Sequence, residues 1–435
     1  MAEKREMVLR AVMQILEEDY AGQPECTSRN DAQQWLAAFA SAGKAGALDD
    51  GLFMQYLSQY LAGFMDPNLS FEASPEADWQ PFTCGFSVRR FGDALYVTEV
   101  GEDVRLTLGD ALVLLNESKP DEHLSSLIGN PVNGSDPERQ LWDEMVARCA
   151  HVLVRHADGT EEDISIKRFP RPGFVQSLRP PTVEVLDGVG PDGDERAVVV
   201  RVHHFVDGSV LSAMQQHFDE LAHARRVIID VRDAEEGMIG NAYPLMALFF
   251  DREVNLKDLV GQEFVYTRYT QRNAHLRSGQ LARLLDRSDA SGREWVQAEI
   301  DHVAACAGQG FVKEAEFEED MLFPPAPEGQ QVFLLTDVRT RGAAERLAAI
   351  AERAAAQGCG KVRRVGRATR GGLDYANLIA VAFDEKFSLV YPISKTEAAH
   401  EGRGMLGQGI APDVYVPFTS EECMRDLVLE AALGC

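Results

Sequence analysis

The stretch VFLLTDVRTRGAAERLAAI, residues 332–350, contains the change of pattern that decides the fold. It begins with the apolar run VFLL, typical of a buried strand, and ends in strong helix formers with apolar residues at helical spacing. Between them lies a sharp corner at 336–345. A strand that turns directly into a helix points backbone N–H groups at an anion, and many hydrolases hold a nucleophile there. The central residue of this corner is Gly342, which has neither hydroxyl nor thiol.

The composition indicates a large globular protein of mixed α/β class. The chain has 435 residues, of which 45% are hydrophobic, enough for two or three domains by length alone. Helical and strand-like runs alternate along it. The net charge of −26, without a basic stripe, argues against nucleic acid and against an anionic membrane surface as partners. The charge also has a simpler explanation, as a means of keeping the protein soluble.

Targeting, redox and metal signals are weak throughout the sequence. The N-terminal helix carries charges along its length, and no run of about 18–20 uncharged apolar residues occurs, so we expect a cytoplasmic protein without a membrane span. Seven cysteines without a CxxC pair favour reduced thiols. No HExxH, no paired Cys/His set and no phosphate-binding loop is present, so the sequence predicts neither a metal nor a cofactor.

The pattern of elements divides the chain into three regions. Residues 1–75 read as amphipathic helices, and residues 80–172 as short strands with two hairpins, one turning at Gly-Asp and one at Asp-Gly. Residues 180–435 return to alternating strands and helices. Within them RRVIIDV (225–231) contains three consecutive apolar residues, VII, as expected for a strand covered on both faces. The polar stretch 252–328 reads as a helical insertion or lid.

The order of these parts resembles the tail-specific, or C-terminal-processing, family of serine peptidases. That family includes the tricorn protease core and the repeats of interphotoreceptor retinoid-binding protein. The resemblance implies a PDZ-like module at 80–172 and a ClpP/crotonase-like α/β core after it. Four stretches carry the resemblance: RRVIIDVRDAEEG (225–237), TRGAAE (340–345), VGRATRGG (365–372) and EGRGMLGQGIAPDVYV (401–416).

The resemblance also implies functional positions, and this sequence departs from them. Gly342 stands where the family has its nucleophilic Ser, and Gly372 where one branch has a Lys base. Where another branch has a His base, the turn DPNLSF has Asn68, which cannot take a proton from a hydroxyl at neutral pH. The family's oxyanion-stabilising N-x-G-G is AEEG here. Its first glycine is replaced by Glu236, whose charge would oppose an oxyanion.

The nucleophile, the base and the oxyanion-stabilising loop are all altered. This favours a pseudoprotease that binds a peptide, or the C-terminal segment of a protein, without cleaving it. Maturation of a peptide natural product is one setting in which such a protein is expected. A ligand would add a strand to a sheet edge. The residues expected to line the groove are Asn68, Glu236, Gly237, Met238, Gly342 and Ala343.

Other readings stay open at this stage. A hydrolase or peptide-modifying enzyme would use Glu236, Asp233 or Cys306, the last at helical spacing from a histidine. A scaffold would bind through residues 80–172 alone. Gly342 is explained equally by an enlarged pocket or by the backbone angles of a tight corner. The basic run 361–367 is expected to have half of its side chains on a solvated face, with binding of a peptide carboxylate as the alternative.

Overall fold

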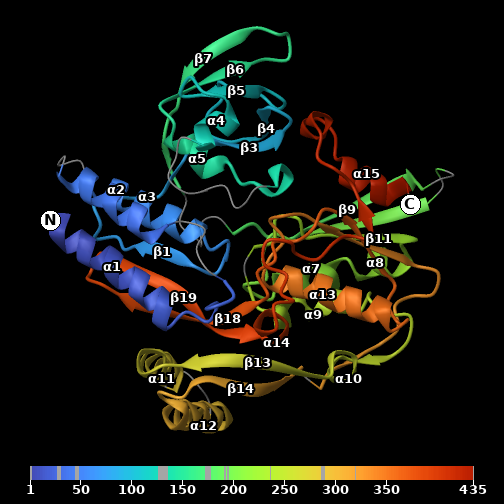
Figure 1. The fold of residues 1–435 in the computed structure, drawn as a ribbon. Coiled ribbons are helices and arrows are strands. Elements are labelled where there is room, and N and C mark those ends of the chain that lie inside the picture. Colours follow the sequence, from blue (N-terminus) through green and yellow to red (C-terminus); the bar gives the residue numbers. More distant parts are fainter. Residues whose placement is uncertain are drawn as a thin grey trace.

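The computed structural model consists of three groups of elements (Figure 1). It describes residues 2–26, 31–44, 49–125, 136–171, 178–190, 193, 195–235, 237–285, 290–318 and 320–434. The β3–β7 module, residues 82–171, lies apart from the α1–α3 helices and from the core sheet in this view. None of the helices in these ranges is long and apolar enough to cross a membrane.

The N-terminal helices cover a sheet to which distant parts of the chain contribute. Trp35, Phe39, Phe53 and Phe71 are buried there with Leu389 and Tyr391 of the C-terminal third. The first strand of the sheet pairs antiparallel with β19, Ser70 lying opposite Val390. Burial of aromatic side chains therefore joins the two ends of the sequence. The elements are α1 (Ala2–Glu18), α2 (Ala32–Lys44), α3 (Asp50–Ala62), β1 (Ser70–Ala73), β18 (Tyr375–Ala382) and β19 (Phe387–Thr396).

The β3–β7 module is an antiparallel sheet with its own buried core around Trp142. Both predicted hairpins are present. Gly92, at φ 59°, turns the first, and Gly159, at φ 85°, turns the second. The elements are β2 (Phe82–Thr83), β3 (Phe86–Phe91), β4 (Ala94–Val100), β5 (Ala111–Leu115), α4 (Pro120–Ser125), η1 (Pro137–Arg139), α5 (Asp143–Arg148), β6 (His151–Arg155), β7 (Glu161–Ser165) and β8 (Phe169–Pro170).

The core is a six-stranded sheet with the order β20-β17-β16-β11-β10-β9, parallel except for β9. Both faces are covered, as the apolar residues within 225–231 predict. Val227 and Ile229 pack toward α13, and Ile228 packs toward α15. The elements are β9 (Thr182–Val189), β10 (Glu195–Arg201), α7 (Ser209–Gln216), α8 (Phe218–His223), β11 (Arg226–Asp230), η2 (Ile239–Ala242), α9 (Tyr243–Met246), β16 (Gln331–Thr336), α13 (Ala343–Ala356), β17 (Val362–Gly366), α14 (Glu397–His400), β20 (Val414–Tyr415), η3 (Ser420–Cys423) and α15 (Leu427–Gly434).

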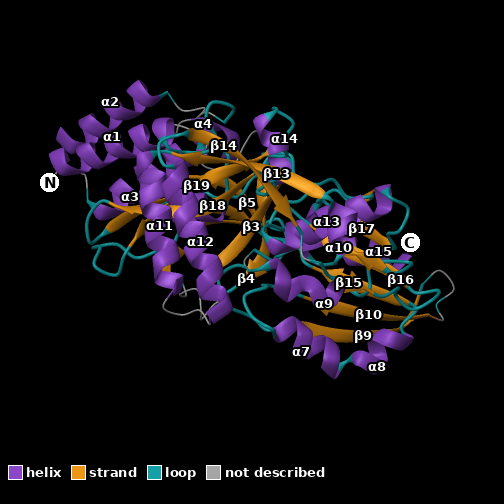
Figure 2. Ribbon diagram, turned by 90° about the horizontal axis from the view of Figure 1, so that it is seen from below, coloured by secondary structure: helices purple, strands orange, loops and turns teal. Residues whose placement is uncertain are grey.

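The polar stretch 252–328 is not wholly helical, so that part of the expectation is wrong. Helices α11 (Gln271–Leu285) and α12 (Ala290–Cys306) form a hairpin, but strands flank them (Figure 2). β13 (Gln262–Tyr269) pairs along its whole length with β14 (Gly310–Phe317). On its other edge, residues 265–267 pair antiparallel with β19. QEFVYTRY is rich in β-branched and aromatic residues, which favour a strand. The short elements are β12 (Val254–Asn255), α10 (Leu256–Val260) and β15 (Leu322–Phe323).

Candidate functional site

The corner between β16 and α13 keeps an unusual backbone conformation at Gly342. This residue has φ 59° and ψ −126° and precedes α13 without a side-chain cap hydrogen bond. L side chains rarely adopt a positive φ, whereas glycine does so at no steric cost. The turn has the strained strand-to-helix form in which hydrolases expose a nucleophile. The positive φ agrees with the explanation of Gly342 by the backbone angles of a tight corner, and the explanation by an enlarged pocket stays a prediction.

There is space for a side chain at this corner. Gly342 is exposed. A Cβ atom added to it would meet only the carbonyl oxygen of Glu235, at 3.6 Å, which is ordinary contact. The neighbouring residues are tightly held, because Thr340 Oγ1 donates to the carbonyl of Val231 at 3.0 Å and Arg341 N donates to the carbonyl of Ala234 at 3.1 Å. The corner is thus fixed against the loop that follows β11, and its Thr hydroxyl is already used.

Asn68 and Gly372, far apart in the sequence, are neighbours in the structure. Asn68 Nδ2 donates to the carbonyl oxygens of Gly372, at 2.8 Å, and of Tyr375, at 2.9 Å. The Asn68 backbone N–H donates to Asp66 Oδ1 at 2.9 Å. Both amide hydrogens of Asn68 are therefore occupied in holding the turn 66–68 against the segment 372–375. Neither residue offers a group that takes a proton at neutral pH.

Glu345 connects Gly372 to the corner, a role that the sequence did not reveal. Its side chain is fully buried. One carboxylate oxygen accepts from Thr369 Oγ1 and Gly371 N, both at 2.5 Å, and the other accepts from Gly372 N at 2.8 Å. Burial raises the pKa of Glu345, against these three donors. The only signal in the sequence was its place in TRGAAE.

Gly237 is required by close packing. It has φ 126°, and a Cβ atom there would lie 2.1 Å from the carbonyl carbon of Phe205. Met238 N donates to the carbonyl of Phe205 at 2.9 Å, while the Met238 side chain is 67% exposed. Ala343 is buried beneath the corner. Glu236, the other expected groove residue, lies outside the described residues.

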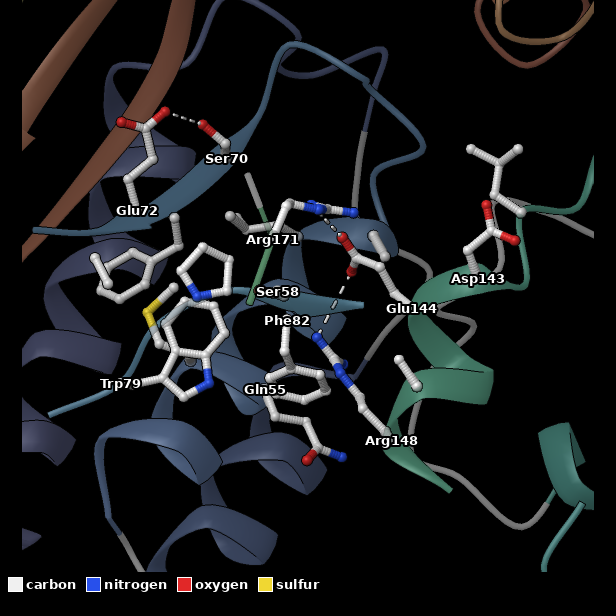
Figure 3. Close-up of a pocket in the computed structure, with 18 of the residues that line it drawn as sticks. Gln55, Ser58, Ser70, Glu72, Trp79, Phe82, Asp143, Glu144, Arg148 and Arg171 are labelled. Carbon is white, nitrogen blue, oxygen red and sulfur yellow. Dashed lines mark hydrogen bonds and ion pairs between the residues drawn. The ribbon is translucent and has the colours of Figure 1, made fainter. Parts of the chain in front are cut away.

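A large cavity of about 1150 Å³ lies where the three groups of elements meet. All four residues of β1 line it, together with Trp79 and Phe82, and its core side is formed by Glu235, Arg339 and Arg370. Figure 3 shows Trp79, Phe82 and Gln55 near one another, with Glu144 between Arg148 and Arg171. The Glu144 carboxylate is 3.6 Å from Arg148 and 3.5 Å from Arg171. The cavity thus combines aromatic surface with charged groups. Its lining includes Glu235, whose carbonyl oxygen is 3.6 Å from a Cβ position at Gly342. The expected groove residues themselves do not line it: Asn68, Gly237, Met238, Gly342 and Ala343.

Comparison with known proteins shows which family the chain belongs to and which solved structures share its fold. Residues 196–416, just over half of it, match the model of Peptidase family S41. The chain belongs to peptidase family S41. Its fold is similar to mature CPAF, alone (13% identity, TM-score 0.65, 99% of this chain and 96% of that one) and in complex with lactacystin (13%, TM-score 0.64, 99% and 97%). A search of curated protein sequences gives no match.

The alternative nucleophile in this S41 chain is poorly arranged. Cys306 Sγ lies 3.8 Å from His302 Nε2, and the same ring nitrogen lies 2.5 Å from Glu314 Oε1. A Cys–His–acid relay requires the two partners on different ring nitrogens. Burial, and then the Glu314 charge, raise the pKa of the Cys306 thiol, which disfavours a thiolate. Asp233, the other described alternative, lines a separate cavity of about 420 Å³.

Two of the four basic residues in the run 361–367 of the S41 chain form internal ion pairs. Arg364 pairs with Asp413 at 2.7 Å and Glu352 at 2.9 Å, and Arg367 pairs with Asp337 at 2.9 Å. Arg363 is exposed, so only part of the run lies on a solvated face, as predicted, while Arg364 and Arg367 are buried and already paired with internal carboxylates. No group of three or more His, Cys, Asp or Glu within the described ranges is arranged to hold a metal ion.

Proposed function

We propose that this S41-family chain binds a peptide, or another extended ligand, in the 1150 Å³ cavity without cleaving it. The observation that carries the proposal is the corner at Gly342. Its backbone has the form that presents a nucleophile, at φ 59° and ψ −126°, and it is exposed, yet it has no side chain. Loss of the nucleophile costs such enzymes several orders of magnitude in rate.

The surroundings of the corner support binding rather than hydrolysis. The Asn68 side chain is fully engaged with two carbonyl groups, so it is unsuited to act as a base. The carbonyl oxygen of Glu235 lies nearest to the position of a Cβ at Gly342. A carbonyl oxygen is an acceptor and repels developing negative charge, whereas an oxyanion requires donors.

The open edge of β1 supports an extended ligand. Among the described strands β1 pairs only with β19, at the end of its sheet, and its residues line the cavity. An unpaired strand edge offers backbone N–H and C=O groups to an added strand, and neighbouring pockets then select side chains. Trp79 and Phe82 supply apolar surface for such side chains.

Gly342→Trp is expected to reduce peptide retention at least about tenfold, because the indole would start beside Glu235 and extend toward the cavity. Gly92→Trp is the matched control. Gly92 also has φ 59°, nothing lies within 4 Å of its Cβ position, and it turns the β3–β4 hairpin, whereas Gly342 lies against Glu235, a residue of the cavity lining. Both changes carry the cost of a positive φ, on the order of 1–2 kcal/mol. The measurement is mass spectrometry of a mixed peptide pool, free and protein-retained, after incubation.

Intact retained peptides, lost in Gly342→Trp and kept in Gly92→Trp, would support the proposal. Equal retention by both variants would contradict a groove at the corner. New fragments that a heat-denatured control does not produce would favour the alternative, an active hydrolase. Retention by the isolated residues 80–172 alone would favour the scaffold. Gly342→Ser is expected to produce no fragments, because Asn68 and the Glu235 carbonyl would remain.

A further inference from the structure

We infer that the peptide bound in the 1150 Å³ cavity presents an acidic side chain, Asp or Glu, to three arginines of the β3–β7 module. Arg148, Arg168 and Arg171 line the cavity from this module, and together they are called the arginine wall. The inference rests on the peptide-binding function proposed above and names the class of ligand that the site selects. None of the three arginines belongs to a family motif or to the basic run 361–367.

The arginine wall is assembled by a short two-stranded ladder and the helix that packs against it. β2 pairs with β8, so Phe82 lies beside the segment that carries Arg168 and Arg171. The Arg168 guanidinium carbon lies 4.8 Å from the centre of the Phe82 ring, and Arg168 Nε donates to the carbonyl of Ala147 at 3.3 Å. Ala147 belongs to α5, which packs against β2 and ends at Arg148. Tertiary packing therefore brings the three arginines together at the cavity.

The arginine wall has more positive than negative charge. Glu144 lies 3.6 Å from Arg148 and 3.5 Å from Arg171, both longer than a charge-assisted hydrogen bond of about 2.7–2.9 Å (Figure 3). Arg168 is exposed and forms no ion pair with any residue that the structure describes. Residues 172–177, which follow Arg171, are PGFVQS and contain no acidic residue. An acidic side chain of the ligand would supply the anion that the wall lacks.

The surroundings of Arg148 favour a further anion. Its side chain is only 20% exposed. Burial lowers the pKa of Arg148, the Glu144 charge opposes this change, and the Arg171 charge adds to it. Asp143, the other α5 carboxylate at the cavity, pairs with Arg339 at 2.6 Å and is not available to compensate. A partly desolvated guanidinium gains strongly from a carboxylate, which it can bind through two parallel hydrogen bonds.

The N-terminal side of the cavity has the opposite charge, which would orient the ligand. Asp49, Glu72 and Asp78 line the cavity from the region of α3 and β1. Figure 3 shows Glu72 on β1, away from Glu144 and its two arginines. An acidic ligand side chain is therefore repelled near β1 and attracted to the arginine wall. The chain has a net charge of −26, so this wall is a local exception to its overall charge.

A singly charged side chain fits the arginine wall better than a phosphate group. Glu144 lies between two of the arginines, and its repulsion of an added anion grows with the charge of that anion. Phe82 also offers apolar surface on which the methylene groups of a Glu side chain could pack. The ligand class is therefore a peptide with Asp or Glu at the position that meets this wall.

The test uses the full chain and a pool of peptides in sets of three, identical except for Glu, Gln or phosphoserine at one position. We expect the unmodified protein to retain the Glu peptides at least about tenfold better than the Gln peptides, because a carboxylate accepts charge-assisted hydrogen bonds. Arg168→Gln and, independently, Arg171→Gln should reduce this preference at least about threefold. Lys167→Gln is the matched control. Lys167 is exposed, precedes Arg168 and does not line the cavity, so the same loss of charge should leave the preference unchanged.

Each other outcome overturns a defined statement. Equal retention of Glu and Gln peptides, or an unchanged preference in both arginine variants, overturns the inference and leaves the proposed function standing. Equal loss of Glu and Gln peptides in both variants would indicate structural arginines, and a preference lost equally in Lys167→Gln would indicate long-range charge; either overturns the inference. Phosphoserine peptides retained better than Glu peptides, with the difference lost in the arginine variants, would replace the carboxylate by a phosphate. No retention of any peptide overturns the proposed function too.

Discussion

Asp337→Asn is expected to lower the free energy of unfolding by about 3 kcal/mol, because it removes a buried carboxylate that pairs with Arg89 and Arg367 and leaves Arg367 with Glu422 as its main anionic partner. Asp337 is 7% exposed. It accepts from Arg89 through two bonds, of 2.5 and 2.8 Å, and from Arg367 at 2.9 Å. Arg89 belongs to β3 and Arg367 follows β17, so this carboxylate joins the β3–β7 module to the core sheet. The measurement is urea unfolding at pH 7.

Asp251→Asn is the control for this prediction. Asp251 is exposed, and its change is expected to stay within about 0.5 kcal/mol. Burial opposes ionisation of Asp337, but Arg89 and Arg367 outweigh it and hold the pKa of the carboxyl well below its usual range. Its contribution is therefore present above about pH 4 and is lost as the pH falls further. A loss below about 1 kcal/mol at pH 7 would show that Glu422, which already pairs with Arg367, and other acceptors replace Asp337.

The strands of the core could be predicted because their signal is local. RRVIIDV and VFLL are apolar at consecutive positions, which only a strand covered on both faces requires, and α13 and α15 supply the two covers. β13 was missed because its place is set by pairing with β14 and β19, more than 40 residues away in the first case and more than 120 in the second. The charged residues Glu263 and Arg268 also obscured the alternation of apolar and polar residues by which a strand is recognised.

The residues of the candidate site also fall into those that the sequence predicts and those that only the fold reveals. Gly342, Asn68 and Gly372 could be named from motifs, since a missing hydroxyl is visible in a sequence. Whether Arg370 has an ion-pair partner could not be predicted from the sequence, because the partner of an arginine depends on the fold. Arg364 pairs with Asp413 and Arg367 with Asp337 across tens of residues, whereas Arg370, three positions further on, forms no ion pair with any residue that the structure describes. Only the three-dimensional arrangement separates these three side chains.

Asp66→Asn is expected to stabilise the protein at pH 8 and to change little at pH 5. Asp66 is 5% exposed, and its Oδ2 accepts from Tyr20 Oη at 2.8 Å. Burial, and then the charge of Asp374, raise the pKa of Asp66 from 3.8 to about 7, against the Asn68 N–H, the Tyr20 hydroxyl and the charge of Arg370. The folded state therefore binds this proton more tightly than the unfolded chain does.

The direction of the pH dependence of stability follows from this difference in proton binding. The contribution of Asp66 to stability is complete below about pH 4 and is lost as the pH rises toward 7. The rise in the pKa of Asp66 from 3.8 to about 7 corresponds to a loss of ~4 kcal/mol in the free energy of unfolding. An amide has no such titration, keeps an acceptor for the Asn68 N–H and offers a donor to the Tyr20 oxygen.

Urea unfolding of both proteins between pH 5 and pH 8 measures this effect. The difference between them isolates Asp66 from the other titrating groups, whose contributions are common to both. Glu385→Gln, at an exposed turn position, is the control and should reproduce the pH profile of the unmodified protein. A parallel profile for Asp66→Asn would mean that Asp66 is ionised throughout. The turn that presents Asn68 to Gly372 would then contain a buried negative charge, stabilised by Arg370 from across the cavity wall.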